Sequence, residues 1–148
     1  MKTTEETKLA VSSTLDMIAE AFEERDLDKM MSLFSTEEDI VVFGTGADEK
    51  RLGKHEVRSL FKRDWSQSEE SSITYNWKLI SAEDNTAWVA TDTTFYARIS
   101  SREIHFPTRL TLVMKKYGSK WLIVHWHASL PAFGQQTGES WPINIPTI

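Results

Sequence analysis

Residues 108–131, TRLTLVMKKYGSKWLIVHWHASLP, do most to define the fold of this chain. They predict two long strands joined by a turn at residues 117–119, and both strands are apolar on both faces. Arg109, His125 and His127 interrupt the apolar pattern. A charged or titratable side chain is costly on a sheet covered on both sides unless it is paired or faces a cavity. The segment therefore predicts a curved sheet with a polar-lined pocket.

The composition is that of an ordinary globular domain, and 148 residues suffice for one domain with a real core. The net charge is −5 and we find no basic stripe, so we expect no nucleic-acid partner. No apolar run approaches the ~20 residues of a membrane span, so we expect no membrane partner. There is no cysteine, which agrees with a cytoplasmic location. We predict a single domain over residues 1–148, with 131–148 as a C-terminal arm.

The hydrophobic periodicity predicts three helices followed by a β meander. The first helix opens with a capping box at Thr3 and ends before Asp26, which caps a short second helix over residues 27–34. A third helix covers residues 53–67. The predicted strands are residues 40–43, 73–80, 86–99, 102–116 and 121–129. The expected fold class is α+β, with the three helices packed on a strongly curved, mostly antiparallel sheet.

This order of elements resembles the cone-shaped, cystatin-like fold of the nuclear transport factor two-like superfamily. Residues 43–49, FGTGADE, resemble its SnoaL-like branch, as do residues 109–113, RLTLV, and 121–129, WLIVHWHAS. The last segment is also similar to the end of the association domain of calmodulin-dependent kinases. The resemblance implies a deep pocket between sheet and helices, and commonly a homodimer formed through the sheet. It selects no activity, because the superfamily includes isomerases, dehydratases, cyclases, binding modules and assembly domains.

The turns predict how the strands pair. A two-residue Ser-Ser turn after the long strand over residues 86–99 places Asp92 opposite Arg109. A Gly-Ser turn at residues 118–119 places Thr111 opposite Trp126. One face of the sheet is then expected to carry a polar and aromatic set, namely Trp88, Asp92, Arg109, Thr111, Val124 and Trp126. A bulge at Pro107 would shift this register by one residue and move Arg109 to the other face.

Such a face is suited to binding a ligand, because a fixed charge can orient the ligand and aromatic rings can cover it. The resemblance implies the same for Arg109, which matches a cavity-facing arginine of the kinase association domain. The alternative is an Asp92–Arg109 pair that only satisfies itself. We predict a small, partly apolar ligand with an anionic group. The predicted ligand-binding residues are Arg109, Asp92, Trp126, Trp88, Thr111 and Trp65.

Other candidate sites favour structural interpretations. His125 and His127 lie about 6–7 Å apart along one side of a strand. No spacing singles out a third ligand, so we predict two buried, hydrogen-bonded histidines and no metal. Trp65 ends the apolar stripe of the third helix, as core packing or as a pocket lid, and Asp64 beside it is expected to be solvated. The turn at residues 44–46 lacks the pattern of a phosphate loop, and no motif indicates a cofactor.

Three functions follow. The first is a small-molecule-binding domain with no assignable chemistry. The second is an acid–base isomerase, dehydratase or hydrolase with Asp92 as base and Arg109 or Trp126 as orienting group. The third is an assembly module. We also expect a homodimer through the sheet, because helices on one face would leave Leu110, Leu112 and Ile123 in water on the other.

Overall fold

The computed structural model describes residues 3–144, and in this range it contains three helices and one six-stranded sheet. The helices are α1 (Glu5–Glu24), α2 (Leu27–Ser32) and α3 (Gly53–Ser66). The strands are β1 (Val41–Phe43), β2 (Lys50–Leu52), β3 (Glu70–Glu83), β4 (Thr86–Ile99), β5 (Arg102–Tyr117) and β6 (Lys120–Ser129). None of the described helices is long and apolar enough to cross a membrane.

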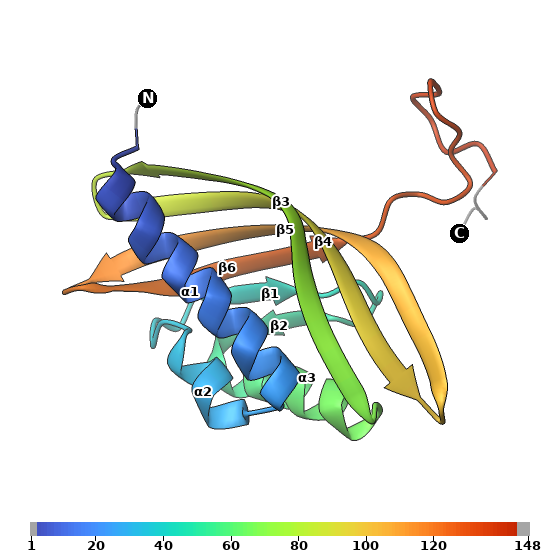
Figure 1. The fold of residues 1–148 in the computed structure, drawn as a ribbon, viewed down its shortest axis with the longest axis horizontal. Helices are drawn as coiled ribbons and strands as arrows, with labels where there is room; N and C mark the ends of the chain where they lie inside the picture. The colour runs from blue at the N-terminus through green and yellow to red at the C-terminus, as the bar shows by residue number, and fades with distance from the viewer. Residues whose placement is uncertain (1–2, 145–148) are drawn as a thin grey trace.

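The strands follow the order β2-β1-β6-β5-β4-β3, and every pairing is antiparallel except the parallel pairing of β1 with β6. The sheet is strongly curved but not closed, and the three helices lie on its concave side (Figure 1). The predicted fold class is therefore confirmed. β2 escaped prediction because its three residues, Lys-Arg-Leu, carry neither length nor an apolar pattern.

The helix caps differ from prediction at one residue. The side chain of Thr4, rather than Thr3, caps α1 and accepts a hydrogen bond from the Thr7 backbone nitrogen at 3.2 Å. Thr3 instead accepts a hydrogen bond from the Ala82 backbone nitrogen at 3.0 Å, which ties the start of the chain to β3. Asp26 caps α2 as predicted and accepts from the Lys29 backbone nitrogen at 3.0 Å.

The core fills the space between the concave face and the helices. Leu110, Leu112 and Ile123 are fully buried there, so the expectation that they would lie on an uncovered face was wrong. The strand segments that carry them are apolar on both faces, and the sequence pattern alone does not tell which face receives the helices. Leu60 is also buried, and Leu27 is half-buried against the same core.

The register of β4 and β5 matches the prediction. Asp92 lies opposite Arg109, and Ser100 and Ser101 form the turn with positive φ angles of 51° and 67°. No register shift occurs at Pro107. That proline lies beyond the last residue of β6 that pairs with β5, so its missing N–H costs no hydrogen bond.

The register of β5 and β6 differs from the prediction by one residue. It follows the Gly-Ser turn as far as the pair Met114–Ile123, but a bulge at Val124 then intervenes. As a result Thr111 lies opposite His127, and Trp126 turns to the concave face. A bulge moves one strand by a single residue and so exchanges its faces, and the sequence gives no local signal of this one.

The convex face carries its own apolar side chains. A second bulge at Asn76 reverses the alternation of β3, so that Tyr75 faces the core while Trp77 and Leu79 face outward. Trp77, Leu79 and Trp88 are 52%, 56% and 36% exposed. Beyond β6, the described residues 131–144 form turns without helix or strand, and this arm leads away from the sheet (Figure 1).

Candidate functional site

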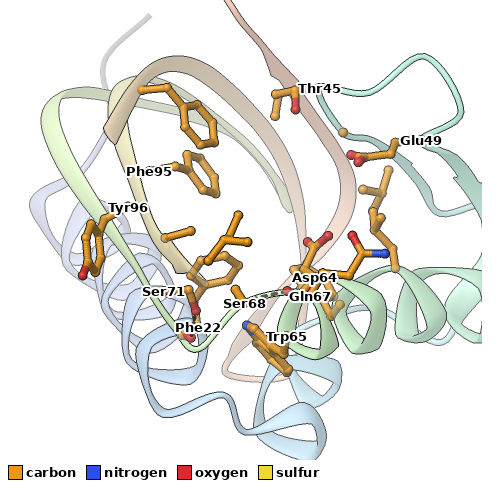
Figure 2. Close-up of a pocket in the computed structure, with 18 of the residues that line it drawn as sticks. Phe22, Thr45, Glu49, Asp64, Trp65, Gln67, Ser68, Ser71, Phe95 and Tyr96 are labelled. Atoms are coloured by element: carbon orange, nitrogen blue, oxygen red, sulfur yellow. Dashed lines mark hydrogen bonds between the residues drawn. The ribbon is translucent and has the colours of Figure 1, made fainter. Parts of the chain in front are cut away.

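A cavity of about 240 Å³ lies between the end of α3 and the curved end of the sheet. Figure 2 shows α3 forming one wall and the strands arching over the other. Aromatic side chains from five elements line it: Phe22, Phe61, Trp65, Phe95, Phe106 and Trp126. The cavity exceeds the ~150 Å³ that suffices for benzene in an engineered apolar cavity, so it has room for a substituted ring.

The rings of the wall support one another. Phe95 stacks on Phe106 with centroids 5.7 Å apart and meets Phe22 edge-on at 5.6 Å. Phe61 contacts Trp65 at 5.8 Å and Trp126 at 5.7 Å. Aromatic pairs at these separations hold fixed geometries, so the apolar wall is preformed.

Asp64 brings a carboxyl group into this aromatic environment. Its carboxylate rises from α3 into the cavity (Figure 2) and accepts no hydrogen bond from any residue in the described range. Burial raises the pKa of Asp64 to about 7, and the neighbouring Glu49 carboxylate adds to the rise. The carboxyl group is thus half-protonated near neutral pH and can either donate or accept a proton.

The expectation that Asp64 would be solvated was wrong, and helix geometry explains why. Val57, Leu60, Phe61 and Trp65 are the buried stripe of α3. Asp64 follows Leu60 by four residues and Phe61 by three, so it lies on the edge of that stripe. The spacing could have identified it as a half-buried acid.

Glu49 approaches the same cavity from the loop between β1 and β2 (Figure 2). The loop is closed by backbone hydrogen bonds from Gly44 N to Glu49 O at 2.9 Å and from Glu49 N to Gly46 O at 3.0 Å. The Glu49 side chain folds back over Gly44 and occupies the space that a Cβ atom there would need. This is the role of the Gly-Thr-Gly turn noted in the sequence.

Arg63 holds the Glu49 carboxylate from outside the cavity. Its Nη2 atom donates to Glu49 Oε1 at 3.2 Å and its Nη1 atom donates to Asp48 Oδ2 at 2.7 Å. The Glu49 side chain is only 20% exposed, whereas that of Asp48 is 69% exposed. Glu49 is therefore the shielded member of the network, and Asp48 the solvated one.

Arg25 fixes the floor of the cavity. It ends α1 in a left-handed conformation with φ of 59°. Its guanidinium donates to the backbone oxygens of Trp65 and Ser68 and, at 3.1 Å, to Ser68 Oγ. The Trp65 carbonyl belongs to the last turn of α3, and the Ser68 carbonyl lies just beyond the end of the helix. Helix termini leave such groups without helical partners. Arg25 therefore positions the helical turn that carries Asp64.

Trp65 packs in the core, the first of its two predicted roles, and it also lines the cavity. Its side chain is 8% exposed, and its indole nitrogen is buried without a hydrogen-bond partner among the described residues. Buried N–H groups of this kind are rare in native proteins.

The structure divides the predicted ligand-binding residues between the two faces of the sheet. Trp126 and Trp65 line the cavity. The other four lie together on the convex face, where Asp92 and Arg109 are exposed cross-strand neighbours. The expected cavity position of Arg109 was therefore wrong. The inward turn of Trp126 at the Val124 bulge separated it from the rest of the set. The four residues that lie on the convex face are Trp88, Asp92, Arg109 and Thr111.

His125 and His127 also lie on the convex face, where they pair with β1 beside Phe43. Their rings lie 6.2 Å and 5.1 Å from that of Phe43. His127 is exposed rather than buried, and His125 is half-buried. Burial and the neighbouring His127 lower the pKa of His125.

Comparison with known proteins gives a consistent fold assignment. The sequence profile of the SnoaL-like domain matches residues 11–133. The structure is similar to that of a protein of Streptomyces avermitilis from the NTF2-like family, provisionally named a dehydratase. The TM-score is 0.77 at 17% identity, and the match covers 84% of this chain and 96% of that one.

Two further solved structures are similar to this chain. A nuclear transport factor 2 (NTF2-like) superfamily protein of Salmonella enterica has a TM-score of 0.77 at 17% identity over 92% of this chain and 96% of its own. A Xanthomonas campestris protein provisionally named a calcium/calmodulin-dependent protein kinase II association domain has a TM-score of 0.73. It is 22% identical, over 82% of this chain and 85% of its own. At these identities the likeness shows the fold alone. None of the curated proteins matches this sequence significantly.

Proposed function

Because the chain belongs to the SnoaL-like domain family, we propose that it binds a small, largely aromatic molecule in the cavity between α3 and the sheet. The observation that carries this proposal is a cavity of about 240 Å³ with a preformed aromatic wall. The cavity also holds the carboxyl group of Asp64, which has no hydrogen-bond partner among the described residues. Pockets with apolar walls and a few convergent polar groups are the usual form of small-molecule sites.

The polarity of the cavity favours a ligand other than the acidic one expected from the sequence. That expectation rested on Arg109, which lies on the convex face. Of the described residues that line the cavity, Asp64 and Glu49 are the charged ones, and none is Lys, Arg or His. A ligand that offers a hydrogen-bond donor to these carboxyl groups fits better than a carboxylate.

Filling the cavity tests the proposal. Ala97 and Ala90 lie on the same strand, but Ala97 lines the cavity whereas Ala90 lies on the convex face. In thermal-shift titrations with 2-phenylethanol, the wild type and Ala90→Leu should be stabilised, and Ala97→Leu should not. Equal stabilisation of both variants would place the ligand outside the cavity. The absence of any stabilisation of the wild type by a panel of small aromatic alcohols, ketones and amines would contradict the proposal.

Acid–base catalysis is a second candidate, which the raised pKa of Asp64 favours. A general base works best when its pKa lies near the working pH. Asp92, the base expected from the sequence, is exposed on the convex face, so Asp64 takes that role. The neutral indole of Trp65 is the adjacent donor.

Proton exchange provides a test of this activity that needs no knowledge of the natural substrate. Phenylacetone in D₂O loses a proton from the carbon beside its carbonyl to the Asp64 carboxylate and regains a deuteron. We expect the protein to accelerate this exchange, which proton NMR can follow. The rate should rise with pH about a midpoint near the pKa of Asp64, and Asp64→Asn should abolish the acceleration. Equal rates for the two proteins would reject this role for Asp64 and leave the binding function standing.

We also propose that the chain forms a homodimer through the convex face. Support comes from Trp77, Leu79 and Trp88, which expose large apolar side chains on neighbouring strands. Contiguous apolar patches on a surface are typical of protein interaction sites. The opposed Asp92 and Arg109 lie on the same face and would supply polar contacts.

A further inference from the structure

We propose that Glu49 determines the ligand specificity of the cavity, and that the preferred ligand is an aromatic compound whose side chain ends in a protonated amine. This inference rests on the proposed binding function and adds the chemical class of the ligand. It assigns the Gly-Thr-Gly loop a role in recognition, beyond that of connecting β1 to β2.

The Glu49 carboxylate is built into the wall of the cavity. Backbone hydrogen bonds at both ends of the loop fix its backbone, and the missing Cβ of Gly44 leaves room for its side chain. The ion pair with Arg63, in which Nη2 lies 3.2 Å from Glu49 Oε1, fixes the position of the carboxylate. A charged group held in this way needs no reordering when a ligand binds, so its contribution to affinity is not lost to side-chain entropy.

The charged side chains that a ligand meets in the cavity are acidic. Arg63 contacts Glu49 from outside and does not line the cavity, so it holds the carboxylate in place without offering a cation to the ligand. Asp64 faces the same space and adds a second acceptor when a cation approaches. A carboxylate ligand would meet the like charge of Glu49, and no cationic side chain among the described lining residues offsets it, so the two charges disfavour one another.

The end of the cavity away from Glu49 is aromatic. Phe22, Phe95 and Phe106 form a continuous ring cluster there. It can cover the apolar body of the ligand, and ring faces also attract cations. The cavity therefore has an apolar half and an anionic half, which matches a ring joined by a short chain to an ammonium group.

Three probes with one ring and different head groups test the inference: 2-phenylethylamine, 2-phenylethanol and phenylacetate, titrated calorimetrically near neutral pH. For the wild type we expect the amine to bind at least about tenfold more tightly than the alcohol, and the acid more weakly than the alcohol. Glu49→Gln should bring the amine to within about threefold of the alcohol and leave the affinity for the alcohol unchanged.

Asp48→Asn is the matched control. Asp48 pairs with the same arginine but does not line the cavity, so this variant should keep the wild-type order of affinities. A wild type that binds the alcohol as tightly as the amine would overturn the inference and leave the proposed function intact. An amine preference that survives Glu49→Gln but is lost in Asp64→Asn would also overturn it. If none of the three probes binds, the proposed function fails for this ligand class and the inference fails with it.

Discussion

The carboxylate of Glu49 lies directly over Gly44, in the space that a side chain at residue 44 would fill. The glycine is needed here for the close approach rather than for a special backbone angle, because its φ is not among the positive ones. This contact places a second acid on the cavity wall near Asp64 and joins a surface loop to the site.

Gly44→Ala should displace the Glu49 side chain. The new methyl group meets the carboxylate and Cβ of Glu49, and the flexible side chain can move away at a cost of about 1–2 kcal/mol. We expect this small loss in urea unfolding, together with loss of the amine preference, as in Glu49→Gln. An unchanged preference for 2-phenylethylamine would show that the carboxylate position does not matter.

Asp64 should make the stability of the protein depend on pH. Its pKa is about 7 in the folded protein and near 3.8 when solvated, so between these values the folded state binds more protons than the unfolded state. The free energy of unfolding therefore falls as the pH rises through this window, and the loss is complete above about pH 8.

Asp64→Asn removes this dependence, because the amide never ionises. We expect the variant to exceed the wild type by about 2–4 kcal/mol at about pH 8 and to match it at about pH 4, in urea unfolding. Asp39→Asn, at an exposed residue, should follow the wild type throughout. A wild-type curve that rises between about pH 5 and 8 relative to Asp64→Asn would contradict the burial of this carboxyl group.

Arg25→Ala should destabilise the protein by about 2–3 kcal/mol, because it leaves two backbone carbonyls at the end of α3 without their charged donor. Arg25→Lys should recover only part of the loss, since an ammonium group lacks the fork geometry. Arg58→Ala removes an exposed ion pair with Asp28 and should cost less than about 0.5 kcal/mol. Similar effects of Arg25→Ala and Arg58→Ala in urea unfolding would reject the positioning role of Arg25.

The convex face should control oligomeric state. Trp77→Ser combined with Leu79→Ser should convert a dimer into a folded monomer in sedimentation velocity experiments, because both side chains are more than half exposed in one chain. Leu9→Ser changes a leucine of α1 that is 71% exposed and should leave the dimer intact. A wild type that sediments as a monomer at micromolar concentrations would contradict the dimer.

The sequence was sufficient to predict the architecture, because the stripes around Leu60 and Ile18 and the two tight turns are local signals. It also predicted the Asp92–Arg109 pair, since no bulge lies between that pair and its turn. It failed for the composition of the site. The Val124 bulge moved Trp126 to the concave face, and bulges leave no pattern in the residues themselves.

The two acids of the cavity were missed for different reasons. Asp64 was detectable from its spacing on α3, but the apolar stripe ends on Trp65 and does not include the acid beside it. Glu49 was not detectable, because its position depends on a side chain folding back over Gly44 and on Arg63 from another element. Such contacts between elements follow from the fold and not from spacing along the chain.

The central claim is that ligands bind at the concave face, and the indole N–H signals of the six tryptophans test it most directly. Each signal can be assigned by single Trp→Phe substitutions in ¹⁵N-labelled protein and followed during titration with 2-phenylethylamine. We expect the signals of Trp65 and Trp126 to shift in a saturable manner, while those of Trp77 and Trp88 stay in place. Saturable shifts confined to Trp77 and Trp88 would place the site on the convex face beside Arg109 and contradict the account.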